Sequence, residues 1–415
     1  NFEIANTFLL NDDQEMALKF YNIFLLKYPN SSYAKEALLK IGVINYNLSN
    51  EEAALESLDK VLKNYPDTSE SRDALLTIKN IYVNQNRVDE YFKYVKQNTK
   101  LSISTVEQDS ITFYAAEARY MEADCQAAIP AFEAYLDKFP NGLFTLTANY
   151  YLADCQLRSG SMWKALPYYE YVAKQPKSQY TEVALLNVAN IAFNIKNYAK
   201  SNEYFNKLAE TSEIDANILQ ASVGVMRTWY LLENYSNTIQ SATNLLQNER
   251  LTNELREEAN YLIAKSYYNL GDTAAARQAF EPMKQSTNGA YAGEAYYCEA
   301  EAYYKRGEMK NAEQVILTIT ATPVSDYWLA KSFILWADIY YAAGNKLQAK
   351  QTLQSIIENY DGDELVEMAQ QKYDSIVNEE NKVREEREKQ IQQMKEDDNE
   401  IDMSSTVSEE RKTNE

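Results

Sequence analysis

Apolar residues recur along this chain with the spacing of amphipathic helices, and short polar segments interrupt them at regular intervals. Residues 139–176 show the pattern clearly. The second half of this stretch carries an apolar stripe at i, i+4 and i+7, formed by Ala165, Tyr169 and Val172. The first half has a similar stripe, and the segment 159–161, Ser-Gly-Ser, separates the two. We therefore expect two helices joined by a tight turn.

The same pair of helices recurs through most of the sequence. A small residue near the start of the second helix has equivalents at intervals of 36 to 38 residues, which are Ala17, Ala54, Tyr91, Ala128, Ala165, Ser201, Thr238, Ala276, Ala312 and Ala349. Twelve residues before each lies a second such position, which holds Ala in seven units and Gly in one. A helix pair cannot bury its apolar face alone. The periodicity therefore predicts an all-α array of ten stacked helix pairs.

The third unit departs most from this pattern, because Lys79 and Tyr91 replace both of its small residues. The segment that follows, 101–109, is expected to be a connection. We accordingly divide the array into units one to three, residues 1–100, and units four to ten, residues 101–360.

Both ends of the chain differ from the repeats. The first small position is residue 5, so we expect the chain to begin inside a helix and the natural protein to extend upstream, where any targeting segment would lie. Residues 361–396 are expected to form a helix that caps the last pair with an apolar stripe and then becomes almost entirely charged. Residues 397–415 lack a packing face and are expected to form a disordered acidic tail.

Composition argues against several classes of function. The chain has 41 basic and 61 acidic residues and a net charge of -20, which argues against binding to nucleic acid. It has no histidine and no Gly-rich phosphate loop, so we predict no enzymatic activity, no metal and no cofactor. No apolar run approaches the roughly 18 residues that a membrane span needs.

The three cysteines are too few and too scattered for a zinc site or a disulfide scaffold. Cys125 and Cys155 fall on helices that should be antiparallel neighbours, so their sulfurs can approach each other. We favour two small buried side chains, with a disulfide as the alternative. Cys298 would remain unpaired in either case.

The repeat resembles the tetratricopeptide repeat. That family has small residues at positions 8 and 20, an apolar residue at 24 and proline at 32, and the fourth unit matches with Ala116, Ala128, Phe132 and Pro140. The period here is near 37 instead of about 34. The resemblance implies a right-handed superhelix with a C-terminal capping helix, and a scaffold for protein–protein interaction. Strings such as YPNSSYAKEALLKIG are also similar to tetratricopeptide proteins of Gram-negative envelopes, including the Tol–Pal-associated coordinator and outer-membrane assembly lipoproteins.

In this family the first helix of each pair lines a concave groove, and positions 5, 9 and 12 point into it. Many of these positions are aromatic here, and tyrosine is doubled at 267–268, 303–304 and 340–341. Adjacent helical residues point about 100° apart, so one tyrosine of each doublet should fill the core (267, 303, 340) and the other should face the groove. The candidate partner-binding residues are Tyr120, Tyr150, Phe193, Arg227, Tyr230, Tyr261, Lys265, Tyr268, Tyr297, Tyr304 and Tyr341.

Two interpretations of these aromatic residues compete. In one, the tyrosines only pack along neighbouring helices. In the other, which we favour, they form a wall for a peptide segment of a partner protein. Arg227 and Lys265 lie toward one end of the row and Glu301 and Asp338 toward the other, so the groove should prefer a peptide with acidic residues at the basic end.

We predict from these features a non-enzymatic scaffold that binds a protein or peptide partner along a tyrosine-lined groove, in the periplasm or cell envelope of a bacterium. One alternative is a carbohydrate- or peptidoglycan-binding module, because tyrosine walls also stack on sugars. The other is a regulatory region of a larger enzyme or sensor.

Overall fold

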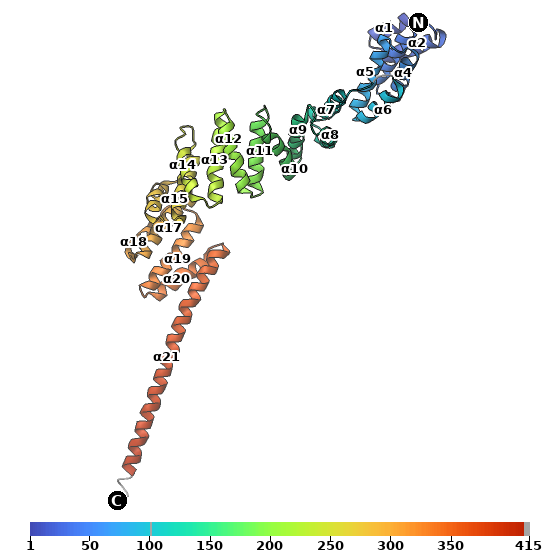
Figure 1. Cartoon of the computed structure of the whole chain (residues 1–415). Coiled ribbons are helices and arrows are strands. Elements are labelled where there is room, and N and C mark those ends of the chain that lie inside the picture. Colours follow the sequence, from blue (N-terminus) through green and yellow to red (C-terminus); the bar gives the residue numbers. More distant parts are fainter. Residues whose placement is uncertain (100–101, 411–415) are drawn as a thin grey trace. The chain divides into compact units, whose positions relative to one another are not determined.

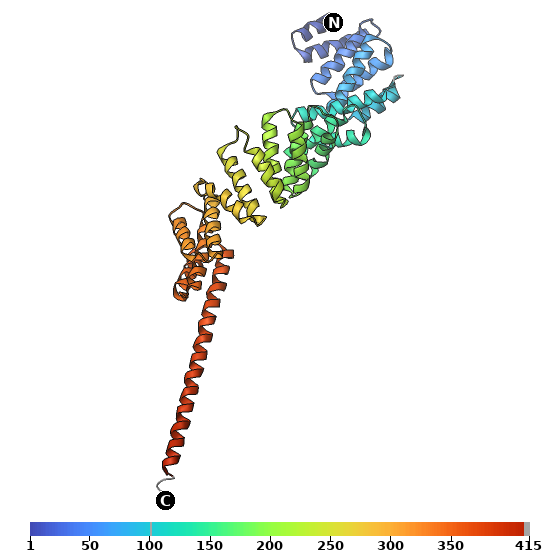
Figure 2. The same cartoon turned by 60° about the vertical axis from the view of Figure 1, so that its left-hand side comes forward.

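The computed structural model describes residues 1–99 and 102–410, with side chains up to residue 395. Within these ranges the secondary structure consists of twenty-one α-helices, α1 to α21, and one short 3₁₀ helix, η1, without a strand. The predicted all-α class is therefore confirmed. The first twenty α-helices form ten consecutive pairs, as the repeat spacing predicts. In both views the two helices of a pair run side by side (Figures 1 and 2).

The chain divides into two compact units, Asn1–Gly224 and Val225–Glu415, and the division falls inside α13 instead of near residue 100. The helices of the first compact unit are α1 Phe2–Leu10, α2 Gln14–Lys27, α3 Ala34–Asn47, α4 Glu51–Asn64, α5 Ser69–Asn84, α6 Val88–Asn98, α7 Thr105–Met121, α8 Cys125–Lys138, α9 Thr145–Arg158, α10 Met162–Lys174, α11 Thr181–Asn194 and α12 Tyr198–Thr211, followed by the first part of α13 Asp215–Leu231. The second contains the rest of α13 and α14 Tyr235–Leu245, α15 Asn253–Asn269, α16 Thr273–Phe280, η1 Glu281–Gln285, α17 Gly289–Lys305, α18 Met309–Thr320, α19 Asp326–Ala342, α20 Lys346–Asn359 and α21 Asp363–Glu410.

The small positions of the repeat lie where the two helices of a pair cross. Of the twenty positions, all are buried except Lys79, which is half-buried. A Cβ on Gly42 would lie 2.5 Å from Leu58 Cδ2, so the crossing leaves no room for a larger residue. Ser201 is tolerated because its hydroxyl donates to the carbonyl of Ala189, the facing small position, at 2.9 Å. The repeat register read from the sequence is therefore confirmed.

The turn inside each pair holds one residue in the left-handed conformation, with φ between 57° and 78°. Only four of these ten residues are glycine, which adopts this conformation without strain. The other six are Asp12, Ser49, Asn86, Ala123, Lys196 and Glu233. An Asp or Asn follows the turn in most pairs and caps the second helix, as Asp124 does by accepting from the Ala127 amide at 3.0 Å.

Two boundaries differ from the sequence-based expectations. Helix α7 begins at Thr105, inside the segment expected to be a connection, because Ser104 caps it by accepting from the Glu107 amide at 3.2 Å. Helix α21 continues to Glu410, past the expected end at residue 396. It contains neither Gly nor Pro and is rich in Glu, Lys and Gln, which favour helix. Residues 411–415 of the expected tail lie outside the described residues.

Helix α21 covers the apolar face of the last pair, as expected for a capping helix. Leu365, Ala369 and Ile376 of α21 are buried in one cluster with Leu353 and Ile356 of α20. This cluster closes the second compact unit at its C-terminal end.

We expect Ala300→Leu and Ala337→Leu each to lower the free energy of unfolding by about 1–3 kcal/mol, because three extra heavy atoms must fit into a filled helix crossing. Both alanines are essentially inaccessible to solvent. Ala342→Leu is the matched control, because Ala342 is exposed and lies on α19, the helix that carries Ala337. It should change the free energy of unfolding by less than about 0.5 kcal/mol. Urea unfolding followed by circular dichroism measures both. Equal stabilities for the buried and exposed substitutions would contradict the assigned register.

Candidate functional site

Four tyrosines occupy position 12 of the last four repeats, and we call this set the tyrosine face: Tyr230, Tyr268, Tyr304 and Tyr341. They lie near the C-terminal ends of α13, α15, α17 and α19, the first helices of the last four pairs. The side chains of Tyr268 and Tyr341 are 37% and 43% exposed, whereas the other two are half-buried.

The hydroxyl groups of the exposed tyrosines are held by carboxylates of the following helix layer. Tyr268 donates to Glu301 on α17 at 3.1 Å. Tyr341 donates to Glu379 on α21 at 2.7 Å. Burial and the nearby Glu301 raise the pKa of Tyr268 to about 12. The hydrogen bonds from Tyr341 and Lys346 lower the pKa of Glu379. Each ring is therefore fixed along the array while part of its surface stays accessible.

The doublets behave as expected in two of three cases. Tyr267 and Tyr340 pack against buried clusters, and their neighbours Tyr268 and Tyr341 are exposed. In the doublet 303–304 both rings are half-buried against one cluster, formed by Ala300, Ala312, Ile316, Leu335 and Ile339. The bulky Leu335 and Ile339 of the next pair supply this apolar surface, so the expectation that Tyr304 alone faces outward is wrong.

The position 5 tyrosines of the second compact unit are fixed by neighbouring rings. Tyr261 stacks on Tyr291 with the ring centroids 4.1 Å apart, and its hydroxyl donates to Glu294 at 2.5 Å. Tyr297 lies 5.3 Å from the Trp328 ring. Burial raises the pKa of Tyr261 and of Tyr297. The neighbouring side chains therefore hold the rings of both tyrosines in place.

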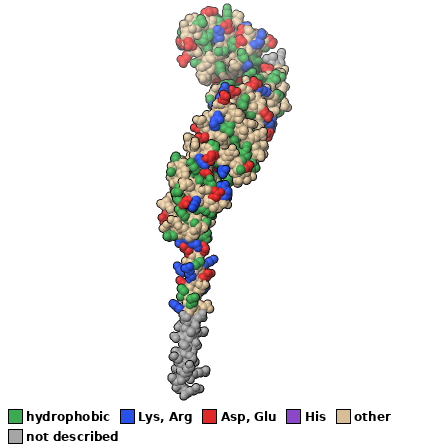
Figure 3. All heavy atoms as spheres, turned by 90° about the vertical axis from the view of Figure 1, so that its left-hand side faces the viewer, with side chains coloured by type: hydrophobic (Ala, Val, Ile, Leu, Met, Phe, Trp, Pro, Cys, Tyr) green, Lys and Arg blue, Asp and Glu red, His purple; other side chains and the backbone are tan. Residues whose placement is uncertain are grey.

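The four charges expected to form a gradient are each paired inside the chain. Arg227 binds both carboxylate oxygens of Glu258 at 2.7 Å, and Lys265 pairs with the buried Glu294. Glu301 pairs with Lys305 at 2.9 Å and Asp338 with Lys372 at 2.7 Å. The expected gradient of charge along the groove is therefore wrong, because each of these charges forms a local ion pair. Figure 3 likewise shows acidic and basic side chains mixed over the face in view.

Three of the predicted residues belong to the first compact unit. Tyr120 donates to Asp154 on the next first helix at 3.0 Å, as Tyr268 does to Glu301 in the second unit. Tyr150 stacks on Tyr180, and Phe193 meets the ring of Tyr198 edge-on. The predicted partner-binding residues are therefore divided between the two compact units, and we treat them as two sets.

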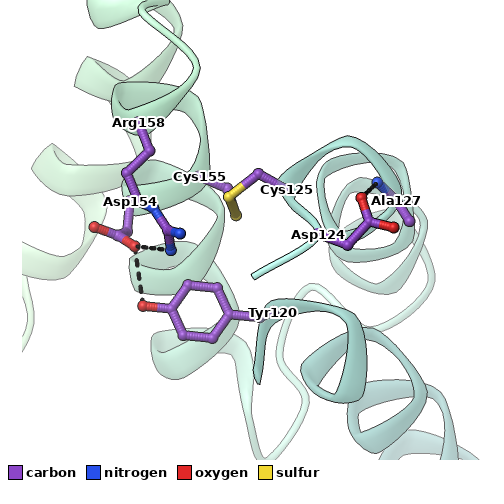
Figure 4. Close-up of a disulfide and its surroundings, with 7 residues drawn as sticks. All are labelled: Tyr120, Asp124, Cys125, Ala127, Asp154, Cys155 and Arg158. Atoms are coloured by element: carbon purple, nitrogen blue, oxygen red, sulfur yellow. Dashed lines mark hydrogen bonds and ion pairs between the residues drawn. A yellow bond between two sulfur atoms is a disulfide. The ribbon is translucent and has the colours of Figure 1, made fainter. Parts of the chain in front are cut away.

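A disulfide joins two neighbouring pairs in the first compact unit. Cys125 opens α8 and Cys155 lies on α9, with their Cα atoms 5.1 Å apart (Figure 4). The favoured interpretation of two unpaired cysteines is wrong, because the start of α8 packs directly beside α9. Tyr120, Asp154 and Arg158 lie next to the disulfide. Cys298 is a free thiol.

The described part of the chain shows neither a metal-binding cluster nor a membrane-spanning helix. No cluster of three or more His, Cys, Asp or Glu side chains there is arranged to hold a metal ion. None of the described helices combines the length and apolar character needed to cross a bilayer.

Comparison with protein-family models identifies the repeats. One tetratricopeptide repeat model matches residues 36–68, 258–281 and 327–363, and a second matches residues 115–180. The chain carries tetratricopeptide repeats. The matched segments coincide with the second, fourth, fifth, eighth and tenth helix pairs. Such repeats stack into binding surfaces and suggest a protein–protein interaction scaffold.

Several solved structures are similar to this chain at low identity. A tetratricopeptide repeat protein from Parabacteroides merdae is 17% identical, with 63% of this chain and 96% of that chain covered and a TM-score of 0.32. Yeast Tom70 is 10% identical, with 92% and 95% covered and a TM-score of 0.36. The P58(IPK) TPR domain is 14% identical, with 91% and 97% covered and a TM-score of 0.25.

A search of curated proteins gives no match. The comparisons do not support the narrower resemblance to Gram-negative envelope lipoproteins.

Proposed function

We propose that this protein is a non-enzymatic scaffold that binds an extended or helical segment of a partner protein along the tyrosine face. The observation that carries the proposal is the arrangement of Tyr268 and Tyr341, whose rings are partly exposed while their hydroxyls are anchored to Glu301 and Glu379. A ring that is already fixed loses little conformational entropy when a partner packs against it. Tyrosine is also enriched among the residues that dominate binding energy at protein interfaces.

We place this scaffold in an oxidising compartment, the periplasm or cell envelope of a bacterium. The support is the disulfide between Cys125 and Cys155. Disulfides persist in secreted and periplasmic proteins and are rare in the reducing cytosol. Mass spectrometry of the protein isolated from its native cells, with free thiols blocked at lysis, tests this placement. Fully reduced Cys125 and Cys155 would contradict it.

The binding proposal is tested with peptides selected on the full chain from a random 12-residue phage library. We expect the double substitution Tyr268→Ser and Tyr341→Ser to weaken the binding of selected peptides at least about tenfold, since each such residue contributes about 1–2 kcal/mol or more. Fluorescence anisotropy with synthetic peptides gives the dissociation constants. Tyr28→Ser with Tyr114→Ser, two tyrosines that are 56% and 52% exposed outside the tyrosine face, is the matched control.

Circular dichroism must show that both variants fold. Unchanged peptide affinity in the Tyr268/Tyr341 variant would contradict the proposal. Soluble peptidoglycan fragments form a second arm of the experiment. If these fragments bind, lose binding in the Tyr268/Tyr341 variant, and no peptide is selected, then the carbohydrate-binding alternative holds instead.

A further inference from the structure

A mostly apolar pocket of about 80 Å³ lies in the second compact unit, between the second helix of the eighth pair and the first helix of the ninth. Six side chains supply the apolar part of its lining: Tyr268, Ala276, Phe280, Ala295, Cys298 and Ala302. An engineered cavity of about 150 Å³ holds a benzene molecule. The pocket is about half that size, which suits a short aliphatic chain or a thioether better than an aromatic ring.

The pocket exists because two positions are small at this interface and large at the next one. Cys298 and Ala302 of α17 correspond, one repeat later, to Leu335 and Ile339 of α19. Those two residues are buried and pack with Ile316 of the preceding helix, so the equivalent space is filled. The space is therefore open between the eighth and ninth pairs and filled between the ninth and tenth.

The second helix of the eighth pair is also interrupted at this point. Helix α16 ends at Phe280 after 8 residues and continues as the 3₁₀ helix η1, whereas the equivalent helices α18 and α20 have 12 and 14 residues. Pro282 in η1 has no amide proton to donate, which ends the α-helical hydrogen bonding there. The chain therefore leaves the helical path beside the pocket.

Charged side chains surround the opening. Lys284 pairs with Glu281 and Glu299 at 2.7 and 2.8 Å, and the carboxylate of Glu301 holds both Lys305 and the Tyr268 hydroxyl. Arg277 is exposed and forms no ion pair among the described residues, although its charge acts on Glu308 from beyond ion-pair distance. Next to the apolar pocket, the rim therefore offers one exposed cation, Arg277, that no carboxylate of the described residues binds directly.

We infer that this pocket holds one leucine or methionine side chain of a partner segment, and that Arg277 binds the carboxylate of a neighbouring acidic residue. The inference rests on the proposed function and defines part of the sequence that the partner must carry, because Tyr268 belongs to both the tyrosine face and the pocket wall. Leucine and methionine are aliphatic or thioether side chains of suitable length, while tyrosine, phenylalanine and tryptophan carry rings.

The test uses the peptides selected from the random 12-residue phage library. Wild-type protein should enrich peptides with Leu or Met beside Asp or Glu. The double substitution Cys298→Leu with Ala302→Ile installs the side chains that the next repeat carries at these positions, so it fills the pocket with a combination this fold already uses. We expect it to weaken binding of the enriched peptides at least tenfold. Arg277→Ala should weaken binding severalfold only for peptides with the acidic residue.

Cys298 offers an independent readout in the wild-type protein. It is the single free thiol of three cysteines, because Cys125 and Cys155 are joined. Burial raises the pKa of Cys298 to about 12, so alkylation by N-ethylmaleimide is slow and is followed as a time course at neutral pH. A saturating enriched peptide should slow the alkylation at least fivefold, and the same peptide with Leu or Met replaced by Ala should not. This arm does not depend on the folding of any variant.

The outcomes separate the two proposals. If peptides bind the Cys298→Leu/Ala302→Ile variant as tightly as wild type but bind the Tyr268/Tyr341 variant more weakly, the pocket proposal is wrong and the tyrosine-face proposal is supported. Alkylation of Cys298 at an unchanged rate with bound peptide also overturns the pocket. Peptides that bind both variants like wild type overturn both proposals.

Discussion

Replacing Asp109 by Ala is expected to lower the free energy of unfolding by roughly 3–5 kcal/mol. Asp109 is only 5% exposed, and its carboxylate accepts hydrogen bonds from the Tyr135 hydroxyl at 2.6 Å and the Leu143 amide at 2.7 Å. Each buried donor left without a partner costs about 1–3 kcal/mol. The substitution orphans two donors and opens a void beside Gly142, where an added Cβ would lie 2.8 Å from Asp109.

The hydrogen bonds of Asp109 connect three elements of the fold. It lies on α7, Tyr135 on α8, and Leu143 in the turn that leads into α9. Asp109→Asn keeps one acceptor oxygen and should lose about half as much stability. Asp137→Ala, at an exposed position of α8, is the control and should change stability by less than about 0.5 kcal/mol. Urea unfolding provides the measurement, and a midpoint for Asp109→Ala equal to that of wild type would disprove the role.

Removing the disulfide is expected to lower the free energy of unfolding by about 3 kcal/mol. Cys125 and Cys155 are 30 residues apart in the sequence, and closing a loop of that length restricts the unfolded chain by about 2–4 kcal/mol. The variant is Cys125→Ser with Cys155→Ser, and Cys298→Ser serves as the control because its thiol is free. Dithiothreitol should destabilise wild type by a similar amount and leave the double variant unchanged. A destabilisation of the double variant by dithiothreitol would show that another cause is at work.

The repeat could be predicted from the sequence because its main determinant is local. A helix crossing without space demands a small residue, and such residues recur at a fixed interval, from Ala17 to Ala349. The start of α7 was also within reach. A serine followed three residues later by a glutamate is a common signature of a helix start, and Ser104 and Glu107 match it. The expectation of a connection there followed from the third unit, in which Lys79 and Tyr91 replace both small residues.

The features that the sequence did not predict depend on residues about one repeat away. Asp109 is buried because a turn 34 residues later folds over it. Arg227 and Lys265 are neutralised by glutamates 31 and 29 residues downstream, on the next first helix. In each case the pairing becomes visible only when the stacking of neighbouring helices is known. A search for opposite charges about 30 residues apart would have found the ion pairs, since the repeat length is regular.

The disulfide also alters how the protein carries mechanical load. When a chain is pulled from its two ends, tension passes through the sulfur–sulfur bond and bypasses the 30-residue separation between Cys125 and Cys155. The segment between the two cysteines cannot be extended by force while the bond is intact. An extended chain spans about 3.3–3.6 Å per residue, so the shielded segment amounts to roughly 100 Å of contour length. Reduction would therefore turn a link between two helix pairs into a stretch of extensible polypeptide.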